Sequence, residues 1–183
     1  MINKTIYTIG HSTHSIGDFI AILQSFAIEI LVDIRRFPSS RKYPQFNAGQ
    51  LEASLAEAQI TYLHMEALGG RRSPKKDSQN TAWRNAGFRG YADYMESAAF
   101  RTAIRQLEQV ASQQNAAIMC AEAVWWRCHR SLVADYLKMN GWKVWNIMGL
   151  DKAVEHPFTA AANLVHGKLT YQTPNLFTDE NEI

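Results

Sequence analysis

The stretch that decides the fold is AAIMCAEAVWWRCHRSLVADYLKMNGWKVWNIM, residues 116–148. It opens with a short apolar run, residues 116–121, which is typical of a buried strand. Apolar residues then recur at helical spacing over residues 132–137, and Gly141 is suited to end that helix. A second run of apolar and aromatic residues follows at 142–148. Strand, helix and strand thus succeed one another, an alternation that favours a parallel sheet covered by helices.

The same alternation extends back to the N-terminus. Further strands are expected at Ile6–Ile9, Ile30–Ile34 and Ile60–Met65, and helical stripes at residues 16–26, 48–58 and 91–110. We therefore expect a single α/β domain over residues 1–177, with a mostly parallel sheet of about five strands, helices on both faces and a Rossmann-like layering. A short helix is expected within residues 157–165, and a flexible tail over residues 178–183.

The composition is that of a globular protein. Hydrophobic residues make up 46% of the 183 residues and charged residues 20%, which argues against an intrinsically disordered chain. No apolar run approaches the roughly 18 residues of a membrane span, so no membrane association is expected. The N-terminus turns polar after a short apolar stretch, and two cysteines cannot form a disulfide framework. We therefore expect a cytoplasmic protein, and the sequence makes no prediction of its oligomeric state.

Basic residues are concentrated in two segments, although the formal net charge is only +2. The segment 35–42 contains four basic residues and no acid; the basic residues are Arg35, Arg36, Arg41 and Lys42. The segment 69–90 carries six basic residues against one acid and has no clear period. This distribution indicates a local anion-binding face, and a loop of that length is typically functional or mobile. We expect it to act as a lid; a solvated loop without function is the alternative.

Reactive side chains follow several of the expected strands. Open α/β sheets bind ligands outside the carboxyl ends of their strands, and these ends share one edge when the sheet is parallel. We therefore expect a single site at that edge. Its expected catalytic residues are His11, Glu122, Cys128 and His129, and its expected substrate-binding residues are Ser12, Arg35, Gly69, Gly70, Arg71 and Arg130.

Cys128 is the expected nucleophile or redox-active thiol of this site. It lies near the start of a helix and beside Arg127, His129 and Arg130, and helix N-termini and cations both favour a thiolate. Cys120 ends an apolar strand and is expected to be a buried, inert thiol. The alternative is that Cys128 is likewise a small packing residue. The spacing of the two cysteines and His129 matches no established zinc pattern, so neither a metal nor another cofactor is expected.

Several motifs in this order resemble a known family. They are Thr8-Ile9-Gly10-His11-Ser12, Leu31-Val32-Asp33-Ile34-Arg35 with Pro38, Leu68-Gly69-Gly70, and Cys120-Ala121-Glu122 with Cys128-His129-Arg130. Together they span roughly residues 7–147 and resemble the bacterial and archaeal family catalogued as domain of unknown function 488. The resemblance implies a single α/β domain and brings no established reaction with it.

Three functions agree with these residues. The preferred hypothesis is an enzyme, such as a Cys-dependent hydrolase or transferase, that acts on an anionic, phosphate-bearing substrate (a nucleotide or nucleic acid). In this hypothesis Arg35 and Arg130 hold the anion. A histidine, His11 or His129, carries the proton, and Glu122 acts as a base or an orienting group. The alternatives are a non-catalytic nucleic-acid-binding module and a regulatory domain that binds a small ligand.

Overall fold

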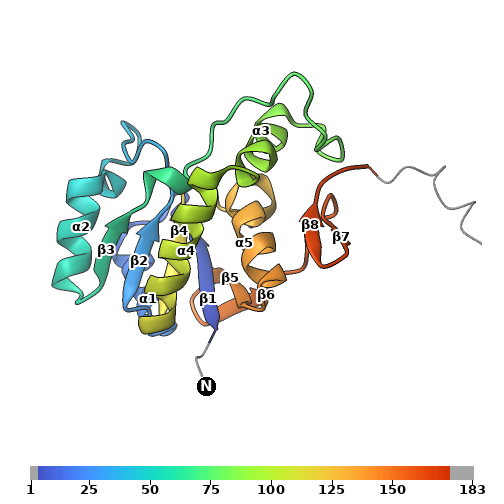
Figure 1. The fold of residues 1–183 in the computed structure, drawn as a ribbon. Helices are drawn as coiled ribbons and strands as arrows, with labels where there is room; N and C mark the ends of the chain where they lie inside the picture. Colours follow the sequence, from blue (N-terminus) through green and yellow to red (C-terminus); the bar gives the residue numbers. More distant parts are fainter. Residues whose placement is uncertain (1–3, 174–183) are drawn as a thin grey trace, which may run out of the picture.

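The computed structural model of this protein describes residues 4–173, which form two β-sheets and five α-helices (Figure 1). The larger sheet has six strands, in the order β3-β2-β4-β1-β5-β6. These strands are β1 (Thr5–Gly10), β2 (Ile30–Asp33), β3 (Thr61–His64), β4 (Ala116–Cys120), β5 (Lys143–Gly149) and β6 (Lys152–Glu155). The α-helices are α1 (Ile16–Ser25), α2 (Ala48–Glu57), α3 (Ala86–Met95), α4 (Ala98–Gln113) and α5 (Arg130–Met139). Three short 3₁₀ helices are η1 (Pro44–Phe46), η2 (Glu66–Leu68) and η3 (Trp125–Arg127).

Five neighbouring strands of the larger sheet run parallel. β1 pairs with β4 and β5, and β2 pairs with β3 and β4, all in the same direction. This confirms the expected parallel sheet of five strands. The sequence does not predict the sixth strand, β6, which pairs antiparallel with β5 at the edge of the sheet. Its four residues, Lys-Ala-Val-Glu, are largely exposed and half of them are charged, so no apolar run marks it.

Helices cover both faces of the sheet, as expected. α1 and α2 pack on one face, and α3, α4 and α5 pack on the other. β2 shows how the sheet serves both cores, because Leu31 points into the first and Ile30 and Val32 point into the second. A strand buried on both faces has a continuous apolar sequence. That is why the inner strands are recognisable in the sequence.

The long segment after β3 ends earlier than expected. The structure begins α3 at Ala86, whereas the helical spacing alone indicates a start near residue 91. The Asn85 side chain accepts hydrogen bonds from the backbone N–H groups of Gly87 and Phe88 and so caps the helix. The first turn of α3 has one large apolar residue, Phe88, beside Ala86, Gly87 and Arg89, so a repeated apolar spacing is visible only from Tyr91 onward.

The prediction of a helix within residues 157–165 is wrong. Irregular chain leads there into a hairpin of β7 (Asn163–Val165) and β8 (Lys168–Thr170). His166 and Gly167 form its turn with positive φ angles of 48° and 73°, a combination typical of type I′ turns. The expected tail, residues 178–183, lies outside the described residues. Across residues 4–173, no helix combines the length and the apolarity needed to span a bilayer.

The connections that leave β1 and β4 turn to opposite faces of the sheet. α1 follows β1 and packs on one face, whereas α5 follows β4 and packs on the other. Because β1 and β4 are neighbours, their carboxyl ends open between two diverging loops. This is the topological switch point, where open α/β sheets bind ligands.

Candidate functional site

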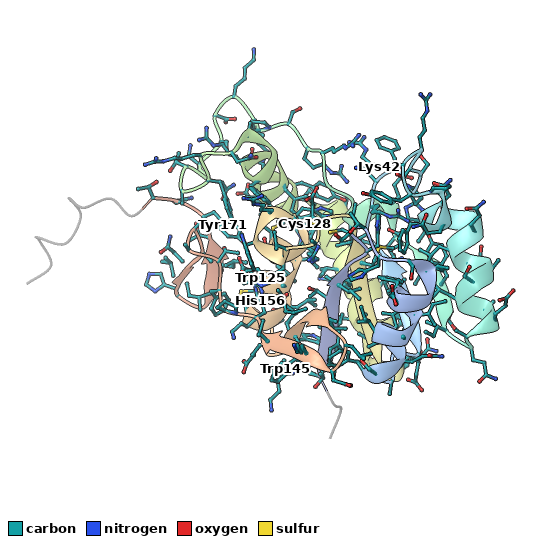
Figure 2. All side chains as sticks on the ribbon, turned by 180° about the vertical axis from the view of Figure 1, so that it is seen from behind. Lys42, Trp125, Cys128, Trp145, His156 and Tyr171 are labelled. Carbon is teal, nitrogen blue, oxygen red and sulfur yellow. The ribbon has the colours of Figure 1, made fainter. Side chains whose placement is uncertain are left out.

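A pocket of about 620 Å³ lies at this switch point. Its wall is made by the segments that follow β1 and β2, by the end of β4 and the loop after it, by two residues after η2 and by the two residues before α5. The lining residues are His11, Ser12, Thr13, Arg35, Arg36, Phe37, Ser39, Ser40, Lys42, Tyr43, Gly70, Arg71, Cys120, Ala121, Glu122, Ala123, Cys128 and His129. Figure 2 shows Lys42 and Cys128 at one end of the sheet and Trp145 at the opposite end.

Eight of the ten expected site residues therefore line one pocket, and two do not. Gly69 packs against Arg36 just outside the lining, and Arg130 lies beneath the pocket floor, where it contacts lining residues. Within the segment 69–90, only Gly70 and Arg71 contribute to the wall. The middle of that segment is held on α3, because Asn80 and Ser78 donate hydrogen bonds to the Asp93 carboxylate.

Cys128 sits between η3 and α5, where its backbone carbonyl caps the helix. The backbone N–H and the hydroxyl of Ser131 both donate to that carbonyl, at 3.0 and 2.9 Å. The Cys128 side chain is nearly buried but reaches the pocket wall. Burial opposes ionisation, yet the hydrogen bond from Cys120 and the charge of Arg130 outweigh it and hold the pKa of the Cys128 thiol below its ordinary value.

His129 is oriented so that one ring nitrogen faces the Cys128 sulfur. Its Nε2 lies 3.1 Å from the carbonyl oxygen of Ile34, which assigns the N–H to Nε2 in the neutral ring. Nδ1 is then the acceptor, and it lies 3.5 Å from Cys128 Sγ. Burial lowers the pKa of His129, while the Ile34 carbonyl acts in the other direction. The thiol proton therefore has an acceptor, and the protonated ring would be a ready acid.

Arg130 is the largest fully buried side chain of the described chain. Its Nη1 donates to the sulfur of Cys120 and to the carbonyl of Glu122, and its Nη2 donates to the carbonyl of Ala123. Its Nε has no hydrogen-bond partner among residues 4–173, and no carboxylate there forms an ion pair with it. A buried cation without a counter-charge is costly, so the site favours negative charge nearby.

The two thiols have opposite tendencies to ionise. Burial, together with the hydrogen bond to Cys128 and the charge of that thiol, raises the pKa of Cys120 well above its ordinary value. Cys120 therefore keeps its proton to a higher pH than Cys128, whose pKa is lowered by the interaction with Cys120 and by the charge of Arg130. Cys128 is the thiol that carries negative charge first, next to Arg130.

Arg35 is held by Asp33, which is not among the site residues expected from the sequence. Its Nε and Nη2 donate to the Asp33 carboxylate at distances down to 2.6 Å, and Tyr62 donates to the same carboxylate at 2.8 Å. Burial, the charge of Asp33 and the hydrogen bond between Tyr62 and Asp33 all raise the pKa of Tyr62. Asp33 interrupts a run of apolar residues in β2, and that interruption is the sequence signal for it.

His11 is fixed in the pocket wall as a neutral ring. It stacks on Phe46 with ring centroids 4.2 Å apart, and its Nδ1 lies 3.0 Å from the carbonyl oxygen of Ser12. Its Nε2 lies 3.4 Å from Nη1 of Arg35, in position to accept from the guanidinium. Burial and the charge of Arg35 lower the pKa of His11 to about 4. His11 is thus suited to orient Arg35 near pH 7 rather than to carry a charge.

Glu122 is exposed at the edge of the pocket. Neither Arg35 nor Arg130 pairs with its carboxylate, because Arg35 binds Asp33 and Arg130 binds the Glu122 carbonyl instead. The mouth of the pocket carries three cations, Arg36, Lys42 and Arg71. Among the lining residues these cations outnumber the single acid, so the opening carries net positive charge.

Glycines at the site permit close approach of neighbouring segments. A Cβ atom on Gly10 would lie 1.7 Å from the carbonyl oxygen of Glu122, so β1 can approach the loop after β4 only with glycine there. A Cβ atom on Gly69 would lie 2.8 Å from the Arg36 Cα, and one on Gly70 would lie 2.8 Å from Nδ1 of His129. Gly69 therefore leaves room for the loop after β2, and Gly70 leaves room for the imidazole of His129.

Replacing Gly70 with alanine should disturb the Cys128–His129 pair directly. The new methyl group would push the imidazole from its place, at an overpacking cost of about 1–3 kcal/mol. We expect slower alkylation of Cys128 by iodoacetamide at pH 7 and a lower midpoint of thermal unfolding. Gly49→Ala in α2 is the control, since nothing lies within 4 Å of its added methyl group. If the two variants have the same alkylation rate and the same midpoint of thermal unfolding, Gly70 does not lie as close to His129 as described.

No group of three or more His, Cys, Asp or Glu side chains within residues 4–173 is arranged to hold a metal ion. The comparisons with known proteins give one result. The model of a family described as "Domain of unknown function DUF488" matches residues 15–137, which is more than half of the chain. The searches of curated proteins and of solved structures found no match to this chain. The matched range contains Arg35, Gly70, Cys128 and Arg130, whereas His11 precedes it.

Proposed function

The chain belongs to the DUF488 family, and on this premise we propose that it is a cysteine-dependent hydrolase or transferase acting on an anionic, phosphate-bearing substrate. The observation that carries the proposal is the Cys128–His129 pair beside the unpaired, buried Arg130. A thiolate and a proton acceptor in the pocket wall, with a cation directly beneath the pocket floor, form an arrangement suited to nucleophilic catalysis. A cationic mouth adds the preference for an anion.

The residues suggest a two-step reaction. The Cys128 thiol gives its proton to Nδ1 of His129, and the sulfur attacks the electrophilic centre of the substrate. A bond from sulfur to that centre forms while the bond to the leaving group breaks, and the leaving group takes the proton from His129. Water or a second substrate then gives its proton to Nδ1 of His129 and attacks the enzyme-bound centre. The bond from sulfur to that centre breaks, Cys128 leaves as the thiolate, and the proton on His129 returns to it. Arg130 stabilises the thiolate at the start and at the end.

Inorganic phosphate should protect Cys128 from iodoacetamide at pH 7. An anion that occupies the pocket blocks the path to the thiol, so the alkylation rate should fall with saturation as phosphate rises at constant ionic strength. Arg71→Gln should weaken this protection because Arg71 lines the pocket, whereas Lys76→Gln should leave it unchanged because Lys76 lies outside the lining. An alkylation rate of Cys128 that does not change with phosphate concentration would contradict an anion site in the pocket. Protection without turnover of any phosphate ester would favour a binding module instead.

A further inference from the structure

Phe37 is an exposed aromatic residue in the wall of the pocket. It is 58% exposed, although it follows the buried strand β2 by only a few residues. A single exposed apolar side chain is ordinary on a protein surface. Phe37 differs because it faces a cavity and is flanked by two cations. The guanidinium carbons of Arg36 and Arg71 lie 5.6 and 5.9 Å from the centre of its ring.

The backbone around this ring is fixed by contacts between two loops. Nη1 of Arg36 donates to the carbonyl of Arg71 at 3.0 Å, which joins the loop after β2 to the loop after η2. Gly69 makes the approach possible, since any Cβ atom there would meet the Arg36 backbone. Arg71 adopts a positive φ of 59°, an uncommon conformation that its neighbours must maintain. The ring and its two cations therefore form a prearranged surface at the mouth of the pocket.

We propose that this surface binds the base of a nucleotide unit, with the base stacked on Phe37 and its phosphate held by the cations of the pocket mouth. The proposal rests on the function proposed above and names its substrate class. Every nucleobase has a flat face that stacks on an aromatic ring, and arginine adds cation–π contacts. A pocket of about 620 Å³ is within the range of small-ligand sites. Free nucleotides and units of a single strand share this chemistry.

The test compares ligands with and without a base. In the wild-type protein, AMP should bind more tightly than ribose 5-phosphate, as measured by calorimetry or by protection of Cys128 from iodoacetamide. Phe37→Leu should lower the affinity for AMP by about tenfold while leaving the affinity for ribose 5-phosphate unchanged, because leucine keeps the apolar bulk and removes the ring. Phe37→Trp should retain or strengthen the binding of AMP. Trp126→Leu is the matched control, since Trp126 is 50% exposed but outside the pocket lining.

Equal affinities of the wild-type protein for AMP and ribose 5-phosphate would overturn the proposal. The proposed function would survive that result if inorganic phosphate still protects Cys128, so the two failures are distinguishable. A short single-stranded oligodeoxyadenosine identifies the source of the base. Tighter binding of the oligonucleotide than of AMP, with the same dependence on Phe37, would support a strand. Tighter binding of AMP would support a free nucleotide.

Discussion

Replacing Arg130 with methionine should slow the alkylation of Cys128 at pH 7 by about tenfold for each unit by which the thiol pKa rises. Arg130 is a buried cation beside the two thiols, and its charge favours the thiolate of Cys128. Without that charge, burial dominates and the thiol holds its proton to higher pH. The rate measured against pH should keep its upper plateau and move its midpoint upward.

Two further variants separate this effect from unfolding. Arg130→Met leaves the carbonyls of Glu122 and Ala123 without their donor, so the variant is compared with Arg130→Lys, which keeps the charge. Arg127→Met is the matched control, because Arg127 is the next cation along the chain but is exposed and outside the pocket lining. A midpoint that moves equally in Arg127→Met and Arg130→Met would contradict a specific role for Arg130. A fall of the plateau with no change in midpoint would indicate lost access, not a changed pKa.

Replacing Asp135 with alanine should destabilise the fold by at least about 3 kcal/mol, because it leaves several buried donors without an acceptor and each unpaired buried group costs about 1–3 kcal/mol. The Asp135 carboxylate is fully buried in α5 and accepts four hydrogen bonds. The donors are Nε2 of His156 at 3.0 Å, the backbone N–H and hydroxyl of Thr159 at 2.9 and 2.6 Å, and the hydroxyl of Tyr171 at 2.9 Å. Figure 2 shows His156 and Tyr171 beside α5, with Trp125 close to His156.

The reason for the large effect is that Asp135 joins distant parts of the chain. It fastens residues 156–171 to α5, the helix that begins at Arg130, two residues after Cys128. Removing the carboxylate leaves these buried donors unpaired. Urea unfolding should show the loss, and Glu155→Gln should cost at most about 1 kcal/mol, because the Lys138–Glu155 pair is partly exposed. If Asp135→Ala lowers the free energy of unfolding by less than about 1 kcal/mol, the Asp135 hydrogen bonds do not have the role described here.

The sequence predicts the architecture because the inner strands are buried on both faces. Runs such as residues 30–32 and 116–121 stay apolar throughout, whereas a polar, mostly exposed edge strand such as β6 leaves no such trace. Strand order is not predictable here, because it depends on which strands pair and not on any one segment. The hairpin of β7 and β8 is missed because its strands are short and half exposed, and because its anchor, Asp135, lies far away in the sequence.

The candidate site follows from the parallel sheet, which brings residues after β1, β2 and β4 to one edge. That reasoning places His11, Arg35 and Cys128 in one pocket, as the structure does. The order of the strands and loops does not predict which hydrogen-bond partner each of these side chains has. Side-chain contacts decide that Arg35 binds Asp33 and that Arg130 lies beneath the floor of the pocket. The surface around Phe37 is also invisible in the sequence, because it needs two loops to meet.

The rate of iodoacetamide alkylation of each cysteine against pH, in the native protein and read by mass spectrometry, tests the nucleophilic thiol most directly. Cys128 should react first near pH 7, with a midpoint below the ordinary pKa of a thiol. Cys120 should stay unmodified until much higher pH, because burial and Cys128 raise its pKa. Both cysteines reacting only after denaturation would contradict a nucleophilic Cys128 and make it a packing residue.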